Sequence, residues 1–385
     1  MSLTISNVFD SNFYRAAHRD LAALNDAQAL SHFQRFGLNE GRLFSPLIDL
    51  SFYRASNSDL AGLNNNQLLN HLMNHGVAEG RSFSPIFEID YYRNQNNDLT
   101  RLNNEQLFIH FNNSGISESR NFSAWTSFGY YKSPNADLAA FNNSQLLNHF
   151  VINGINEGRK ISPYFEFDYY RANNQDLANL NNRQLLYHFK ISGIDEGRKT
   201  SSFFDAGYYK RNNPDLASLR GINLVAHFDK FGTVEGRQAT NDYAGNTFVT
   251  ARQITQSNTH IFEHVGIADA YDYYQFNLGR ISNVTLFNVS FSRSVMEEVI
   301  DSRGNIISSR NTPVAGSDSY PIRNLQLSPG TYYIRIQPQQ GNTNYFLWLS
   351  ATVDFPAEIR RINGEVARIE AIADAYRRAA DLIRF

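Results

Sequence analysis

Hydrophobic and polar positions along this chain follow a pattern that returns every 39 residues. In the stretch FDYYRANNQDLANLNNRQLLYHFKISGIDEGRK, two tyrosines precede a polar segment, and apolar residues then return at Leu185, Leu186 and Phe189. This i, i+1, i+4 spacing predicts one apolar face of a helix. Six copies follow one another without insertion over residues 7–240, as the spacing of one tyrosine column illustrates: Tyr14, Tyr53, Tyr92, Tyr131, Tyr170 and Tyr209.

Polar residues at fixed positions predict where the helices of each copy begin and end. Asp168 is expected to be the N-cap of a short first helix. Asn181 and Gln184 have the spacing of a capping box, which predicts the start of a second helix. Gly193 is expected to end that helix in the left-handed conformation. A helical hairpin of this size cannot bury its apolar face alone, so the six copies are predicted to stack into an α-solenoid.

The end of the fifth copy, GIDEGRKT, resembles a phosphate-binding loop at first sight. However, Arg198 separates the second glycine from Lys199, and no strand rich in Val and Ile precedes the stretch. We therefore interpret it as a helix C-cap and a turn between copies, with Arg198 binding backbone carbonyls or the Asp of a neighbouring Asn-x-Asp-Leu segment. The one His of each copy is expected to form structural hydrogen bonds, because consecutive histidines lack the short spacing of metal ligands.

From residue 241 the pattern changes to short runs with a period of two, which predicts strands. Turns are expected at residues 303–305 and 328–330, and the whole segment 241–352 is predicted to be an antiparallel β-sandwich. The runs are FVTARQI (248–254), DYYQFNL (272–278), NVTLFNVSF (283–291), VMEEVID (295–301), LQLSPGTYYIRIQ (325–337) and YFLWLSA (345–351).

The last 33 residues, 353–385, return to a helical pattern. Apolar residues at alternating spacings of three and four predict a long amphipathic helix with a heptad seam, capped by Asp354. We interpret this helix as a self-association or docking element; packing against its own sandwich and an uncleaved export signal are the alternatives. The seam residues expected to contact a partner are Ile359, Ile362, Val366, Ile369, Tyr376 and Ile383.

Composition narrows the range of functions. The 385-residue chain has a formal net charge of -2 with both signs interspersed, so no basic patch for nucleic acid is expected. There are no cysteines, which excludes disulfides and thiolate metal sites. No apolar run approaches the about 18 residues of a transmembrane helix. No catalytic motif such as HExxH or GxSxG is present, and the recurring His and Asp follow from repetition, so we expect no enzyme.

Two family resemblances follow from these motifs. The repeats resemble the YY-x-x-N-x-D-L…H-F-x-x-x-G-x-x-E-G-R units of bacterial, notably cyanobacterial, surface and multidomain proteins. Residues 241–352 resemble the bacterial pre-peptidase C-terminal (PPC) domain, through NDYAGN, DAYDYYQF, VIDSRGN and LSPGTYYIRI. That resemblance implies a jelly-roll-like sandwich that aids binding, export or stability. Some relatives bind calcium, and the candidate ligands here are Asp242, Asn246, Asp269 and Asp272. Turn formation is the alternative role for such residues.

The leading functional hypothesis is a non-enzymatic scaffold or linker protein that binds partner proteins of a larger assembly. Its expected contacts are the C-terminal helix and the repeat surface. The tyrosine pairs of the repeats are expected mostly to pack in the core and between copies; the alternative is that Tyr92, Tyr131, Tyr170 and Tyr209 contact a partner, because Tyr is enriched at interfaces. An exported adhesin or carbohydrate-binding protein is the alternative, and an accessory subunit of an enzyme is a third. The start MSLTISNVFDSNFY lacks the features of a signal peptide. We therefore expect a cytoplasmic protein, with leaderless export to the cell surface as the alternative.

Overall fold

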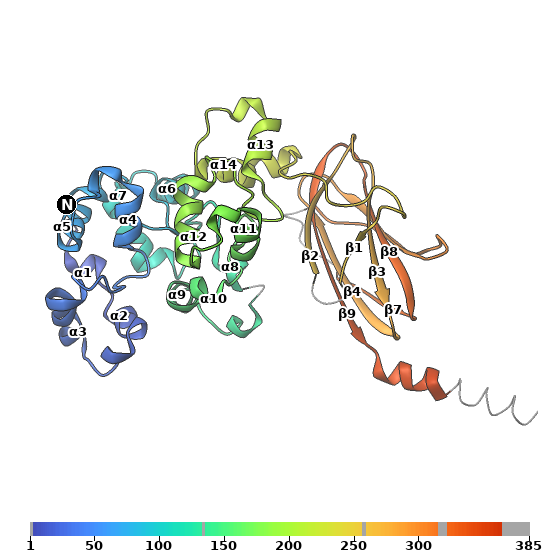
Figure 1. The fold of residues 1–385 in the computed structure, drawn as a ribbon, viewed down its shortest axis with the longest axis horizontal. Helices are drawn as coiled ribbons and strands as arrows, with labels where there is room; N and C mark the ends of the chain where they lie inside the picture. Colours follow the sequence, from blue (N-terminus) through green and yellow to red (C-terminus); the bar gives the residue numbers. More distant parts are fainter. Residues whose placement is uncertain (1–2, 133–134, 256–258, 315–321, 364–385) are drawn as a thin grey trace, which may run out of the picture. The chain divides into compact units, whose positions relative to one another are not determined.

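The computed structural model describes residues 3–132, 135–255, 259–314 and 322–363 (Figure 1). Helices occupy the first part of the chain and strands the second, so the predicted α-plus-β class is confirmed. The chain divides into two compact units, Met1–Asp229 and Lys230–Phe385, which we call the helical unit and the sheet unit. The predicted division into three domains, with boundaries after residues 240 and 352, stays a prediction.

Each copy in the helical unit contains a first helix, a 3₁₀ turn, a second helix and a π-helical turn. The first helices are α2 (Ser11–Ala17), α4 (Leu50–Ser56), α6 (Ile89–Gln95), α8 (Phe128–Lys132), α11 (Phe167–Asn173) and α13 (Ala206–Asn212). The second helices are α3 (Asp26–His32), α5 (Asn65–His71), α7 (Asn104–His110), α9 (Asn143–His149), α12 (Asn182–His188) and α14 (Ile222–His227). Three short helices are also present: α1 (Ile5–Val8), α10 (Ile155–Glu157) and α15 (Thr233–Glu235).

The second helices begin as the sequence predicts. Asn181 accepts a hydrogen bond from the Gln184 backbone at 2.9 Å, and the Gln184 side chain accepts one from the Asn181 backbone at 3.0 Å. The first four copies have the same reciprocal bonds, whereas in the sixth Gly221 precedes α14 without a side-chain cap. The N-cap prediction for Asp168 is wrong. Helix α11 begins at Phe167, after the N-cap residue Glu166, which is two residues earlier than predicted, and Asp168 pairs with Arg171 instead.

The predicted left-handed conformation at Gly193 is also wrong. The second helix continues through a π-helical turn, Phe189–Gly193, and the left-handed glycine is Gly197, with φ 69°. Gly193 is needed for a different reason. A Cβ atom there would lie 2.0 Å from the hydroxyl oxygen of Tyr170, so only glycine lets this tyrosine approach the helix.

Packing in the helical unit links neighbouring copies and also copies that are three apart. Between neighbours, Asn182 donates to the carbonyl of Asn156 at 3.1 Å. Between the second and fifth copies, Asp49 accepts hydrogen bonds from Arg183 and Tyr187, and the Tyr187 ring lies 5.3 Å from the ring of Phe52. The array is therefore wound tightly enough for non-neighbouring copies to touch, which the repeat pattern alone does not indicate.

The sheet unit contains two sheets that share one hydrophobic core. One sheet has the order β1-β3-β8-β5-β6 and the other β2-β9-β4-β7. All pairs are antiparallel except β1 with β3. The strands are β1 (Arg252–Gln253), β2 (Thr259–Val265), β3 (Asp272–Leu278), β4 (Ser282–Ser290), β5 (Val295–Asp301), β6 (Ile306–Asn311), β7 (Arg323–Leu327), β8 (Gly330–Pro338) and β9 (Thr343–Val353).

The structure corrects the strand prediction at three places, one strand that is shorter than predicted and two that were not predicted. The run FVTARQI contains only the two-residue strand β1, because residues 247–250 form a turn closed by a 2.9 Å hydrogen bond between Thr247 and Thr250. Strand β2 was not predicted, because the polar residues Glu263 and His264 interrupt its apolar residues, although both side chains are buried. Strand β6 was not predicted either, because its residues are largely exposed and polar.

The C-terminal segment is helical over residues 355–363, and Asp354 accepts a hydrogen bond from the Ala357 backbone at 3.0 Å, as expected of its cap. Ile359 and Ile362 are 57% and 46% exposed. The other predicted seam residues, Val366, Ile369, Tyr376 and Ile383, lie outside the described residues. Across the described part of the chain, we find no helix with both the length and the apolar character needed to cross a membrane.

Candidate metal centre

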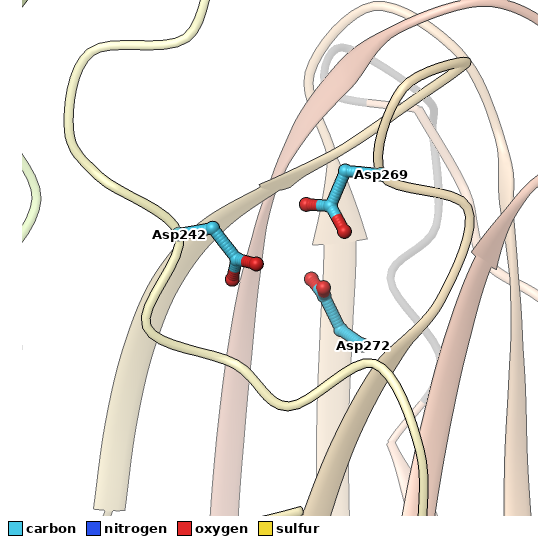
Figure 2. Close-up of side chains that lie close together, drawn as sticks. All are labelled: Asp242, Asp269 and Asp272. Carbon is cyan, nitrogen blue, oxygen red and sulfur yellow. The ribbon is translucent and has the colours of Figure 1, made fainter. Parts of the chain in front are cut away.

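Three carboxylates meet at one end of the sheet unit, from segments that the fold brings together (Figure 2). Asp272 is the first residue of β3, and Asp269 lies in the loop that leads into this strand. Asp242 lies on the segment before β1. This segment is held against β3 by a 2.6 Å hydrogen bond from the Tyr273 backbone to the carbonyl of Gly245.

The spacing of the three carboxylates suits a divalent cation. One oxygen from each of Asp242, Asp269 and Asp272 lies within 4.8 Å of the others. Ca²⁺ binds oxygen ligands at about 2.3–2.6 Å, so two ligands of one ion lie at most about 5 Å apart. The distances therefore allow all three residues to bind the same ion without rearrangement of the backbone.

The hydrogen bonding of these carboxylates is incomplete. Asp272 is fully buried, and its Oδ2 accepts a hydrogen bond from the Tyr345 hydroxyl at 2.5 Å, but its Oδ1 has no partner. The buried Oδ2 of Asp269 has none either. Figure 2 shows the carboxylates of Asp269 and Asp272 facing each other. Because a buried carboxylate without partners is costly, these oxygens require a proton or a cation.

A fourth carboxylate, Glu263 on β2, was missed by the sequence analysis. It is 1% exposed, its Oε2 accepts from the Tyr243 backbone at 3.3 Å, and its Oε1 has no partner. Burial, reinforced by the negative charge of Asp242, raises the pKa of Glu263 to about 8. The available signal was period two: Ile261, Glu263 and Val265 alternate, which places a carboxylate at a core position of a strand.

The electrostatics of the aspartates agree with this picture. Burial raises the pKa of Asp269 to about 6, and the charge of Asp242 adds to the shift. Burial also raises the pKa of Asp242, and that of Asp272 well above its ordinary value. Carboxyl groups crowded in this way resist ionising together. A bound cation would instead favour the ionised form of these carboxyl groups, because it stabilises every carboxylate around it.

The fourth predicted ligand, Asn246, lies beside this cluster. When its side-chain amide is turned so that the nitrogen faces these groups, Asn246 can donate to Oδ1 of Asp269 at 3.2 Å and to the carbonyl of Tyr271 at 3.1 Å. In this orientation Asn246 would hold Asp269 in place. The structure brings Asp242, Asp269 and Asp272 together as the sequence analysis expected, and calcium itself stays a prediction.

The four tyrosines predicted to contact a partner lie in the core of the helical unit. Tyr92, Tyr131, Tyr170 and Tyr209 are all at most 2% exposed. A hydrogen bond joins each tyrosine hydroxyl of this column to the Nδ1 of the histidine 18 residues later. The six distances are 2.9 Å (Tyr14–His32), 2.7 Å (Tyr53–His71), 2.8 Å (Tyr92–His110), 2.8 Å (Tyr131–His149), 2.7 Å (Tyr170–His188) and 3.0 Å (Tyr209–His227). These tyrosines therefore pack in the core, as one of the two interpretations expected, and their burial argues against the alternative of partner contact. The histidines form the structural hydrogen bonds that were expected.

The arginine of the EGR motif is structural too. Arg198 donates from Nη1 to Asp176 and from Nε to Glu196, both at 2.7 Å. Asp176 belongs to the Asn-x-Asp-Leu segment of the same copy, so this interpretation of GIDEGRKT is confirmed. The same three-residue group recurs with Arg42, Arg81, Arg120 and Arg159.

No family model matches the sequence, and no curated protein matches it either. Among solved structures, the pre-peptidase C-terminal domain of a collagenase from Bacillus anthracis is similar to 26% of this chain over 93% of its own length, at 19% identity and a TM-score of 0.22. PliG from Aeromonas hydrophila, a periplasmic inhibitor of g-type lysozyme, is similar over 26% and 96%, at 12% identity and a TM-score of 0.21. A family 6 carbohydrate-binding module is similar over 26% and 98%, at 10% identity and a TM-score of 0.19. Similarities of this size establish no activity, ligand or partner for the chain.

Proposed function

We propose that the chain is a non-enzymatic structural protein, a scaffold or linker whose sheet unit binds a divalent cation. The observation that carries this proposal is the repetition of the same internal hydrogen bonds in the helical unit. Tyr pairs with His in all six copies, and Arg pairs with Asp and Glu in the first five. Side chains that could act as acids or bases are thus engaged in maintaining the fold.

The proposed cation would stabilise the sheet unit. Asp242, Asp269 and Asp272 supply oxygen ligands only, which suits Ca²⁺ better than Zn²⁺ or Cu⁺. Asp242 lies on the segment before β1 and Asp272 on β3, so one ion would link this segment to β3. These residues would hold the ion, whose role here is to neutralise the buried carboxylates.

Partner binding is assigned to the C-terminal helix. Ile359 and Ile362 present apolar surface to solvent three residues apart on the same face. The proposed test is a quantitative pull-down from the source cells with three chains: full length, a version ending at Val353, and the double variant Ile359→Asp, Ile362→Asp. The neighbouring Arg360→Asp is a matched control for the added charge.

A linker anchored by this helix predicts that a defined set of partner proteins is recovered with the full chain and the control. The truncated and doubly substituted chains should lose these partners. Equal recovery by all four chains, or a chain that stays monomeric without partners, would contradict the scaffold proposal.

Carbohydrate binding is the second candidate, and one observation favours it. Beside the carboxylate cluster, Tyr271 is 42% exposed, and the guanidinium of Arg335 lies 5.7 Å from the centroid of its ring. Exposed aromatic rings of this kind can stack on sugar rings. Affinity electrophoresis in gels containing soluble polysaccharide tests this function: Tyr271→Ala should remove any retardation, whereas Ile306→Ala, at an exposed apolar position on β6, should leave it unchanged.

A further inference from the structure

Two pockets in the helical unit are formed by the same positions of the repeat. One has a volume of about 240 Å³ and lies where the third and fourth copies meet; the other, of about 200 Å³, lies where the first and second meet. We call them the 3/4 pocket and the 1/2 pocket. Arg120 and Asn143 line the first, and Arg42 and Asn65, 78 residues earlier in each case, line the second. The pockets therefore differ through individual substitutions, and through Arg183 and Tyr187 of the fifth copy, which line the 1/2 pocket only.

The 1/2 pocket contains a carboxylate. Asp49 caps α4 by accepting from the backbones of Ser51 and Phe52, both at 3.0 Å, and its other oxygen accepts from Arg183 and Tyr187. The pocket lining thus contains both an acid and the groups that neutralise it. A negatively charged ligand would meet the charge of Asp49 there.

The 3/4 pocket has Ser127 at the position of Asp49. The other five copies carry an acid at this position: Asp10, Asp49, Glu88, Glu166 and Asp205. Ser127 still caps its helix, because its hydroxyl oxygen accepts from the Tyr130 backbone at 3.1 Å, and its hydroxyl hydrogen remains available to donate. As the described residues form it, the lining of this pocket contains no carboxylate.

A second departure from the repeat lies in the same pocket. Ser119 has φ 55° and is the one non-glycine residue with positive φ in the described part of the chain. The other five copies have glycine here: Gly41, Gly80, Gly158, Gly197 and Gly236. Strained residues of this kind concentrate at ligand-binding sites. The Ser119 hydroxyl accepts from Asn143 at 2.6 Å, so its hydrogen also remains available to donate.

Two cations complete the pocket. Lys132 donates to the carbonyl of Phe141 at 3.0 Å and has no ion pair among the described residues, so two of its three hydrogens are free. Arg120 uses Nε for Glu118 and Nη1 for Asp98, which leaves Nη2. The lining therefore offers hydroxyl and ammonium donors and the remaining guanidinium nitrogen of Arg120, whose partners Asp98 and Glu118 are not part of the lining.

We propose that the 3/4 pocket binds an oxyanion, meaning a phosphate, a sulfate or the carboxylate of an acidic sugar. These groups accept several hydrogen bonds at once, and charge-assisted bonds from Lys and Arg are the strong ones. Both departures from the repeat, Ser127 in place of an acid and Ser119 in place of glycine, add donors or remove a negative charge at this pocket. The 1/2 pocket retains the carboxylate and is not a site for such a ligand.

The test is isothermal titration calorimetry of the full chain with inorganic phosphate, sulfate and glucuronate, at fixed ionic strength in chloride and without divalent cations. The wild-type chain should show one saturable site for at least one of the three, and the preferred anion identifies the source of the group. Ser127→Asp restores the residue type of the other copies, so the fold tolerates it, and it should weaken binding about tenfold or more. Lys132→Ala should weaken it by a similar factor.

The matched control is Ser117→Asp. It adds the same charge to the neighbouring turn without lining the pocket, and the fifth copy already carries Asp195 at this position. The affinity of the Ser117→Asp chain for the anion should stay within about twofold of the wild-type value, because exposed charges are largely screened. The absence of saturable binding in the wild-type chain would overturn the proposal. So would equal affinities of the wild-type chain and Ser127→Asp.

Discussion

The helical unit and the sheet unit differ in how their polar side chains are hydrogen-bonded. In the helical unit, the recurring Tyr and Arg donors have their acceptors within the same copy, as Tyr170 has His188 and Arg198 has Asp176. In the sheet unit, Asp272, Asp269 and Glu263 are buried with oxygens that have no partner. A repeated unit must satisfy its own polar groups, because every copy has the same ones. Unpaired polar groups gather instead where the chain does not repeat, and there they indicate a binding site.

The largest loss of stability is expected from filling the space beside a glycine that the repeated Tyr–His pair requires. A Cβ atom at Gly193 would lie 2.0 Å from the Tyr170 hydroxyl oxygen. Gly193→Ala should therefore lower the free energy of unfolding of the helical unit by about 3 kcal/mol, as overpacking of a core does. Urea denaturation measures this change. Gly62→Ala is the control, because a Cβ atom there meets nothing within 4 Å; equal losses in both variants would contradict the packing role of Gly193.

Calcium should stabilise the sheet unit by a comparable amount. At a free concentration of 100 times Kd, binding to the folded state alone adds about 2.7 kcal/mol. Thermal unfolding with calcium and with EDTA measures this difference. Asp272→Asn should abolish the calcium response, and Asp301→Asn, in an exposed turn away from the cluster, should retain it. A wild-type chain that unfolds at the same temperature in both buffers would refute this prediction.

The calcium effect should increase with pH. Without a cation, the raised pKa values of Asp269, about 6, and Glu263, about 8, favour the protonated folded state. Their stabilising contribution is fully present below pH about 4 and is lost as pH rises through 6 and 8. Calcium displaces these protons, so each displaced proton adds up to about 1.4 kcal/mol of calcium stabilisation per pH unit.

The measurement is the calcium-dependent shift in unfolding temperature at pH 6 and at pH 8. We expect the larger shift at pH 8, and a smaller difference between the two pH values in Glu263→Gln, which removes one titrating group. A shift independent of pH would mean that protons and calcium do not compete for these carboxylates.

Removing one repeated hydrogen bond should have a smaller effect. Tyr170→Phe deletes the hydroxyl that pairs with His188 at 2.7 Å while keeping the ring. A loss of about 1 kcal/mol in the free energy of unfolding is expected. The equivalent Tyr53→Phe should cost a similar amount, since it removes the same bond to His71. Urea denaturation of both variants checks this, and a neutral result for both would mean that the pair is not stabilising.

The smallest effect, and the one with opposite sign, concerns Ser119. Replacing it with glycine releases the backbone strain at φ 55°. Ser119→Gly should therefore stabilise the helical unit by up to about 1 kcal/mol, partly offset by the greater flexibility of glycine in the unfolded chain. The same urea titration measures it. Destabilisation by this substitution would show that the Ser119–Asn143 hydrogen bond outweighs the strain.

Local features were predictable from the sequence, and long-range ones were not. The capping box at Asn181 and Gln184 depends on residues three positions apart, so spacing alone indicates it. The conformation of Gly193 was mispredicted because a π-helical turn moves the helix end toward Gly197. The contact of Asp49 with Arg183 depends on how tightly the copies wind around each other, which no single copy encodes.

The candidate site was predictable only in part, because only some of its residues are close together in the sequence. Asp269 and Asp272 lie three residues apart, and the motif around them is compact, so the sequence points to them directly. Glu263 lies on β2 of the other sheet, and its charge interacts with Asp242 and Asp272 through a folding arrangement that the sequence does not display. The sequence left two roles open for the tyrosine column, because Tyr suits both a protein interior and an interface, and the burial of these side chains favours the interior.

The central claim is that binding chemistry gathers where buried polar groups lack partners, foremost at the carboxylate cluster of the sheet unit. Isothermal titration calorimetry of the full chain with Ca²⁺ at pH 8 tests it most directly, with Asp272→Asn beside the wild type. The account predicts one saturable calcium site in the wild-type chain and none in the variant. A wild-type chain without saturable binding, or a variant that binds Ca²⁺ equally well, would contradict it.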